Sequence, residues 1–336
     1  MKAVGMFFIV FGHVVGQPFN QFTQPIYPKQ LGVAFFVFIT AWSLANDTRP
    51  RFRILYNRLF SVYFFGLVFA LFLSFLYLFV KNDTNPSNYL PFFLGANVFF
   101  NNFPANPTTW YIGTYLHLLL FWAFFLRGKK IRKRHLFYSL AGEILLRSLM
   151  IISGKGFVAY MLLPNWCTVF LLGLFWAQKQ DEGNSTKLLF LIPAWLGLFA
   201  MWAFISNRIG FDTSFPFRSI SNAFPFAIVT QSMLISLAYC AHTTLFFAIA
   251  RCLPSSRIVS FFSRNTLIIF IAHMPVIYEL SPSLYSLFSS TFLKKAALIL
   301  LLYVGLALVS EGIGKVLNTR TLRDKVWNAL EAKLKA

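Results

Sequence analysis

Apolar residues occur in ten long runs that are separated by polar connections. The runs cover residues 2–16, 31–45, 54–80, 108–126, 135–153, 159–177, 187–205, 223–250, 265–280 and 294–313. A helix needs about 17–25 residues to cross the apolar core of a bilayer, and most of the runs reach that length. Because backbone polar groups in lipid must be paired within their own segment, each run is predicted to be helical. The pattern predicts an all-α fold, a polytopic membrane helix bundle of about ten transmembrane helices.

Two stretches depart from this pattern. Residues 89–100 are apolar but are interrupted by Pro91 and Gly95, which predicts a re-entrant or surface-lying piece. Residues 314–336 are basic and weakly amphipathic, which predicts a tail on the inner membrane surface. The predicted organisation is one transmembrane domain, residues 1–313, followed by a basic cytoplasmic tail, residues 314–336.

The composition excludes a soluble domain and the charge sets the orientation. Only 12% of the residues are charged, against about 25% in soluble domains. The excess of 30 Lys and Arg over 10 Asp and Glu would by itself fit a nucleic-acid partner. If the amino terminus is cytoplasmic, however, 22 of these 30 basic residues fall in inner connections or the tail and seven fall outside. This bias predicts that both termini are cytoplasmic and that the basic charge faces the lipid bilayer and cytosolic anions, with no nucleic acid.

His13 is the first candidate functional residue. It lies in the otherwise apolar or glycine run 3–16, and Lys2 stands eleven positions before it. In a helix, eleven steps of about 100° return to nearly the same face, and the two side chains lie about 16 Å apart along the axis. Ionisable residues at membrane depth are functional by default, so the pair predicts a polar cavity that opens toward Lys2. The alternative is a histidine that hydrogen-bonds a neighbouring helix.

Four further polar or aromatic residues lie in or near the apolar runs. Trp110 and His117 are seven apart and share a helix face, and Trp110 is either an interfacial tryptophan or a platform for a sugar ring. His273 lies in the middle of the ninth run, where it either binds substrate or hydrogen-bonds another helix. Glu279 follows six residues later, near the outer end, and is a candidate for acceptor binding.

Other features are predicted to be structural. Glu143 and Arg147 are four residues apart in the fifth run and are expected to neutralise each other in lipid. Gly5, Gly12 and Gly16 form a stripe that predicts close packing against another helix. The three cysteines have no metal-ligand spacing, no zinc pattern occurs, and no glycine-rich phosphate loop is found.

Several motifs, in this order, resemble the membrane acyltransferase-3 family. They are AVGMFFIVFGHVVG, LGVAFFVFITAWSLA, RFRILYNRLFSVYFF, TTWYIGTYLHLLLFW and FFSRNTLIIFIAHMPVIY. The last motif is similar to a family pattern with serine and tyrosine where Thr266 and Phe270 stand here. The family signature of arginine, ten residues and histidine reads as Lys2 and His13. A second signature, two arginines three residues apart, is half matched, by Arg58.

The resemblance implies an integral-membrane acyltransferase with O-acetyltransferase activity. Such an enzyme takes an acetyl or other short acyl group from cytosolic acyl-CoA and transfers it to a hydroxyl of a cell-surface or lipid-linked carbohydrate. Acetyl-CoA is then a donor substrate, and no permanently bound cofactor or metal is expected. The expected location is the bacterial inner membrane. The alternative is a polytopic transporter or flippase with buried histidines, while a polysaccharide polymerase or ligase would carry longer outer loops.

The candidate residues are assigned to three roles. They are His13 for catalysis, Lys2, Arg53 and Arg58 for the donor phosphates, and Trp110, His117, His273 and Glu279 for the acceptor. A histidine titrates near neutral pH, so His13 can either deprotonate the hydroxyl or carry the acyl group transiently. Arginine suits phosphate by charge and by its bidentate fork, whereas lysine at position 2 keeps only the charge.

The charge distribution predicts which loops are accessible from outside the cell. A cysteine placed at Lys130 should resist an impermeant thiol reagent in intact cells, whereas a cysteine at Asn85 should be labelled. Permeabilised cells, in which both should react, provide the control. Labelling at Lys130 without labelling at Asn85 would invert the predicted orientation.

Overall fold

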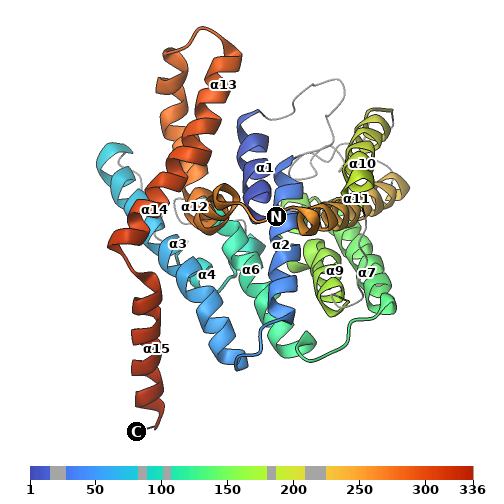
Figure 1. Ribbon diagram of the computed structural model, residues 1–336, viewed down its shortest axis with the longest axis horizontal. Coiled ribbons are helices and arrows are strands. Elements are labelled where there is room, and N and C mark those ends of the chain that lie inside the picture. The colour runs from blue at the N-terminus through green and yellow to red at the C-terminus, as the bar shows by residue number, and fades with distance from the viewer. Residues whose placement is uncertain (16–27, 82–88, 101–106, 180–186, 209–224, 336) are drawn as a thin grey trace.

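Helices account for the regular structure of the chain. The computed structural model describes residues 1–15, 28–81, 89–100, 107–179, 187–208 and 225–335, and no strand occurs in these ranges (Figure 1). Six helices are long and apolar enough to cross a membrane, and three shorter apolar helices accompany them. The six spans are 28–45, 51–80, 133–152, 226–252, 257–286 and 291–316, and the shorter helices are Lys2–Val14, Trp110–Leu126 and Leu188–Trp202.

Most of the helices overlap the predicted apolar runs. Up to the middle of the chain they are α1 (Lys2–Val14), α2 (Pro28–Ala45), α3 (Arg51–Lys81), α4 (Tyr89–Phe93), α5 (Asn97–Phe100), the 3₁₀ turn η2 (Pro107–Thr109), α6 (Trp110–Phe121), its π-helical end η3 (Trp122–Leu126) and α7 (Lys133–Ile152). They continue with α8 (Gly156–Met161), the 3₁₀ turn η4 (Leu163–Trp166), α9 (Cys167–Gln178), α10 (Leu188–Arg208), α11 (Pro225–Cys252), α12 (Arg257–Ser286), α13 (Thr291–Leu300), the π-helical η6 (Leu301–Gly305), α14 (Leu306–Val316) and α15 (Thr319–Lys335). Bulky apolar side chains such as Phe79 and Leu189 are 70% and 77% exposed on the outer faces, as expected of surfaces that meet lipid.

The predicted single helix over residues 159–177 is wrong. The segment consists of α8, the turn η4 and α9, and Leu162 between α8 and η4 is extended, with ψ of 153°. Pro164 explains the break, because proline has no backbone N–H and its ring collides with the carbonyl four residues earlier in a helix. The predicted interruption of residues 89–100 is confirmed, because α4 and α5 are separated by a turn in which Gly95 has φ of +68°.

Helices α1 and α2 pack closely at the centre of the bundle. Figure 1 shows them with α3, α12 and α14 on one side and α7, α9 and α11 on the other. A Cβ atom on Gly32 would lie 2.4 Å from the Gly5 carbonyl oxygen, and one on Gly12 would lie 2.7 Å from the Lys29 backbone nitrogen. The predicted close packing is therefore confirmed at Gly5 and Gly12, while Gly16 lies outside the described residues.

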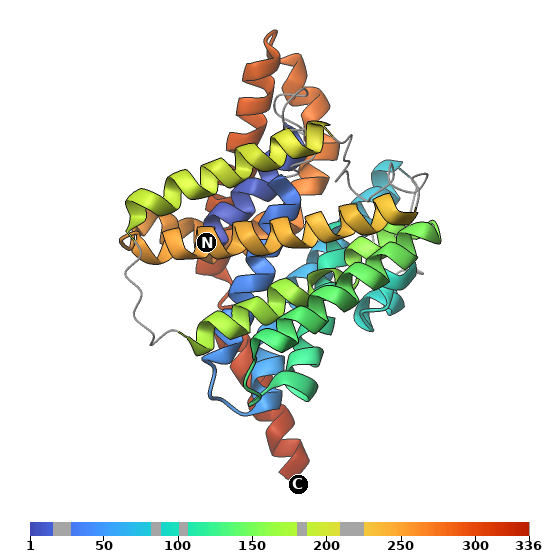
Figure 2. The same ribbon diagram turned by 90° about the vertical axis from the view of Figure 1, so that its right-hand side faces the viewer.

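The carboxy-terminal helix α15 docks on the start of α3. Arg53 Nη2 donates to Asp324 Oδ1 at 2.9 Å, and the Arg53 guanidinium lies 4.7 Å from the ring centre of Trp327. The Tyr56 hydroxyl donates to the Arg323 carbonyl oxygen at 2.8 Å. Beyond these contacts α15 extends away from the bundle toward the carboxy terminus (Figure 2). The basic tail is thus a helix held at one end by a cluster on α3.

The close approach of α1 and α2 predicts a sharp dependence on glycine. Gly32→Ala should lower the free energy of unfolding by about 1–3 kcal/mol, because the added methyl group has no room against the α1 backbone. Gly142→Ala is the matched control, because nothing lies within 4 Å of a Cβ there and alanine is the better helix former. Thermal unfolding in detergent, followed by tryptophan fluorescence, measures both variants. Equal unfolding temperatures for the two variants would contradict the packing argument.

Candidate active site

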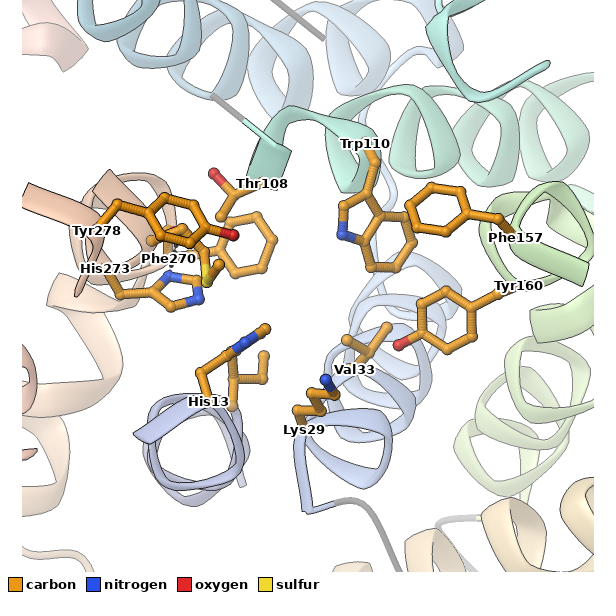
Figure 3. A pocket seen from close by; sticks show the side chains of 12 residues that line it. His13, Lys29, Val33, Thr108, Trp110, Phe157, Tyr160, Phe270, His273 and Tyr278 are labelled. Carbon is orange, nitrogen blue, oxygen red and sulfur yellow. Dashed lines mark hydrogen bonds between the residues drawn. The ribbon is translucent and has the colours of Figure 1, made fainter. Parts of the chain in front are cut away.

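A cavity of ≈ 210 Å³ lies between α1, α2, α6, α8 and α12 (Figure 3). Its lining includes His13, Lys29, Thr108, Trp110, Tyr160, Phe270 and His273. The structure therefore brings three of the predicted site residues, His13, Trp110 and His273, into one place, although they are more than 90 residues apart in the chain.

Two imidazoles lie next to each other on one side of this cavity (Figure 3). The ring centres of His13 and His273 are 5.1 Å apart, with 51° between the ring planes. His273 Nδ1 lies 2.7 Å from the Phe270 carbonyl oxygen and 3.2 Å from that of Ile269. Because carbonyl oxygens only accept hydrogen bonds, these contacts assign the proton to Nδ1 and leave a lone pair on Nε2 of the neutral ring. Among the described residues Nε2 has no hydrogen-bond partner, so it is available to a substrate.

Lys29 is a cavity residue that the sequence reasoning missed. Lys29 is one of the seven basic residues that the charge distribution predicts outside, and it lines the same cavity as His13. The close contact at Gly12 explains the placement, because the Lys29 backbone packs directly against α1 next to His13. The sequence contains a signal for this placement. Because α1 and α2 are consecutive antiparallel helices, the end of α1, which carries His13, lies near the start of α2, which carries Lys29.

Aromatic side chains form the wall opposite the histidines. The rings of Trp110 and Tyr160 have centres 5.1 Å apart, and Phe157 lies beside them (Figure 3). The Trp166 indole N–H donates to the Tyr160 carbonyl oxygen at 3.0 Å and ties α8 to the η4 turn. Neither Tyr160 nor Phe157 is predicted from the sequence, because Tyr160 belongs to the segment 159–177, which the apolar pattern predicts as a plain spanning helix, and Phe157 belongs to the connection before that segment.

A second, smaller cavity lies on the Lys2 side of the first. It has a volume of ≈ 130 Å³, and its lining includes both Lys2 and Arg58. Phe270 lines both cavities, is only 9% exposed, and packs edge-on against Tyr111 with ring centres 5.4 Å apart. Lys2 and His13 were expected to share one polar cavity. The structure instead has two cavities, which we call the inner and the histidine cavity, with Phe270 between them.

Arg58 is held in place beside the inner cavity. Its Nη2 donates to Ser43 Oγ at 2.7 Å and lies 3.7 Å from Asp47 Oδ2. Asp47 also accepts hydrogen bonds from the Arg49 side chain, and this interaction lowers the pKa of the Asp47 carboxyl below its ordinary value. Asp47 is therefore an anion near neutral pH, and it orients Arg58 by its charge.

Three of the predicted residues are not brought into either cavity. Arg53 is bound to Asp324 and Trp327 on α15. His117 packs against Phe99 of α5, with ring centres 5.5 Å apart. Glu279 accepts a hydrogen bond from the Tyr77 hydroxyl at 3.3 Å and lines an apolar groove formed by α3, α12 and α14.

The buried pair Glu143 and Arg147 forms a structural cluster away from these cavities. The two side chains are paired with each other, as predicted. Arg147 also donates to Asn165 Oδ1 at 2.7 Å and to Ser236 Oγ at 2.8 Å, and Glu143 accepts from the Thr168 N–H at 3.1 Å. Both charges are thus fully compensated. The hydrogen bonds that compensate them also join α7, η4, α9 and α11. Within the described ranges, no three His, Cys, Asp or Glu side chains are placed to hold a metal ion.

The fold and the site define an all-helical integral membrane protein with paired imidazoles in an internal cavity. A family model described as an acyltransferase domain matches residues 1–311. The match covers most of the 336 residues, so the chain belongs to the membrane acyltransferase-3 family and is a membrane acyltransferase. The resemblance drawn from the motifs is confirmed. No curated protein and no solved structure matches the chain.

Proposed function

We propose that the protein transfers an acetyl or other short acyl group from cytosolic acyl-CoA to a hydroxyl of a cell-surface or lipid-linked carbohydrate, in a bacterial inner membrane. The observation that carries the proposal is the pair of facing imidazoles, one with its Nε2 lone pair available, in a cavity next to a cationic one. Acyl transfer to a hydroxyl needs a base and a site for the donor, and this arrangement offers both.

The donor enters from the side of the inner cavity. Lys2 and Arg58 place two cations there, and these cations attract the negatively charged coenzyme A toward the cavity. Arg58 is already oriented by Ser43 and Asp47, so little of its conformational freedom is lost on binding. The acyl end of the donor then points past Phe270 toward His13.

The reaction proceeds in two steps. In the first, the lone-pair nitrogen of neutral His13 attacks the thioester carbon, the C–S bond breaks, and the departing thiolate takes the proton from the other ring nitrogen of His13. In the second, the acceptor hydroxyl oxygen attacks the acyl carbon while His273 Nε2 takes the hydroxyl proton. The C–N bond breaks, and the His13 ring recovers a proton from the adjacent His273. Lys29 lies beside His13, where a cation stabilises the negative charge that develops on the carbonyl oxygen.

The acceptor occupies the aromatic side of the histidine cavity. Trp110 and Tyr160 present apolar ring faces opposite the two imidazoles, and such faces pack well against the C–H face of a sugar ring. A sugar in this place has a hydroxyl directed toward His273. The cavity is small, so one sugar unit is held and the remainder of the acceptor lies outside it.

Replacing His13 and replacing His273 should impair different steps of the reaction. His13→Gln should abolish both coenzyme release and acyl transfer, because glutamine keeps a hydrogen-bonding group but cannot carry the acyl group. His273→Gln should slow turnover by about 10²–10⁴-fold, yet it should still release one equivalent of coenzyme A per enzyme when no acceptor is added. Purified protein in detergent, supplied with acetyl-CoA and assayed for free thiol, measures both effects.

His117→Gln is the matched control, because this histidine packs against Phe99 outside the histidine cavity. It should retain most of the wild-type rate. A His13→Gln variant that transfers acyl groups near the wild-type rate would remove His13 from catalysis. Wild-type protein that neither hydrolyses nor transfers the acyl group would overturn the proposed function.

Phe270 should limit the length of the acyl group. Phe270→Ala merges the inner and histidine cavities, so the ratio of butyryl to acetyl transfer should rise about tenfold or more, the scale at which a pocket discriminates by a methylene. Phe262→Ala, on the same helix but stacked on Tyr303, is the control and should leave the ratio unchanged. Initial rates with an acyl-CoA series give the ratio. An unchanged ratio in Phe270→Ala would show that another residue sets the limit.

A further inference from the structure

A third cavity, of ≈ 490 Å³, lies under the loop that joins η3 to α7. Arg127, Lys129 and Lys130 of this loop line it. Its floor is apolar and contains Leu44, Trp122 and Leu174. A cationic rim above an apolar floor suits a ligand that joins phosphate groups to a flat ring, and the volume lies within the usual range for such ligands, about 300–1,000 Å³.

The loop is held in a fixed shape. The Gln178 side chain accepts a hydrogen bond from the Ile131 N–H at 2.9 Å and donates one to the Lys129 carbonyl oxygen at 3.0 Å. Gly128 has φ of +75°, a turn conformation that other residues rarely adopt. The positive-inside rule explains why a cytoplasmic loop is basic, but it does not require a fixed backbone. A binding site benefits from a fixed backbone, because the loop then loses little conformational entropy when the ligand binds.

Arg127 is positioned by two further contacts. Its Nη2 donates to the Arg49 carbonyl oxygen, and its guanidinium lies 5.5 Å from the ring centre of Trp122. The Asp47 carboxylate also lines the cavity, but its charge is compensated by Arg49 at 2.6 Å and Arg58 at 3.7 Å. Because Asp47 lines this third cavity and Arg58 lines the inner cavity, their ion pair lies between the two cavities.

We propose that the cavity under residues 127–130 binds the phosphate-bearing nucleotide end of the acyl donor. The proposal rests on the proposed function, in which that donor is an acyl-coenzyme A. The nucleotide phosphates lie against Lys129, Lys130 and Arg127, and its ring system lies on the apolar floor at Trp122. The slender arm of the coenzyme then runs past Arg58 into the inner cavity. Arg53, which is bound to α15, has no part in this site.

The test compares two donors that differ only in the nucleotide. In the variant Lys129→Ala with Lys130→Ala, the KM for acetyl-CoA should rise at least about tenfold with little change in kcat, because charged hydrogen bonds are lost. The KM for an acetyl thioester of N-acetylcysteamine, which has no nucleotide, should not change. Gln178→Ala should also raise the KM for acetyl-CoA, although it removes no charge.

The matched control is Lys133→Ala with Arg134→Ala, which removes the same charge from exposed positions that do not line the cavity. An equal rise in KM in the control pair would reduce the effect to general electrostatic attraction and overturn the proposal. An unchanged KM in both pairs would overturn it as well.

A binding measurement separates this site from the catalytic proposal. Purified wild-type protein should bind adenosine 3′,5′-bisphosphate in calorimetry, and the Lys129→Ala, Lys130→Ala variant should not. If the wild type binds this nucleotide but transfers no acyl group, the site stands and the proposed function fails. If it transfers acyl groups but binds no nucleotide, the function stands and the site is lost.

Discussion

The contact between α1 and α2 is the constraint on which the histidine cavity depends. Gly5 and Gly32 let the two backbones touch, and Gly12 lets the start of α2 lie against the end of α1. Any side chain at these positions would separate the helices, because backbone atoms cannot move aside as the end of a flexible side chain can. The contact places Lys29 beside His13, and α1 in turn packs against α12, which carries His273. The position of the cavity residues thus depends on the three glycines at the contact between α1 and α2.

A second constraint is that polar groups within a membrane protein must find their partners inside it. The Glu143 and Arg147 pair meets this requirement through Asn165 of η4 and through residues of α9 and α11. The η4 turn is therefore held from one side by the ion pair. From the other side, Trp166 bonds the Tyr160 backbone and stabilises the aromatic wall of the histidine cavity. A cluster with no direct place in catalysis thus supports the surface proposed to hold the acceptor.

The three cavities form a series from a basic surface to the paired imidazoles. Asp47 and Arg58 join the first two, and Phe270 separates the second from the third. This order suits a transfer in which donor and acceptor approach from opposite sides, because a partition keeps water on the donor side from the reactive acyl group. In the proposed transfer, only the acyl end of the donor passes Phe270. The proposed donor site, the passage and the imidazoles are separate features, each carried by different helices.

The helical class, most helix positions, the glycine contact and the choice of His13 as a candidate all followed from the sequence alone, because periodicity, span length and the cost of polar groups in lipid are local properties. The sequence also placed Lys2 and His13 on one face of α1. Only the tertiary structure decided that His273 faces His13, that Lys29 joins them, and that Phe270 divides the path. These are contacts between helices distant in the chain, and an apolar helix has the same pattern whichever face meets a cavity. Arg53 carried a suitable charge at a suitable position, but packing against α15 commits it elsewhere.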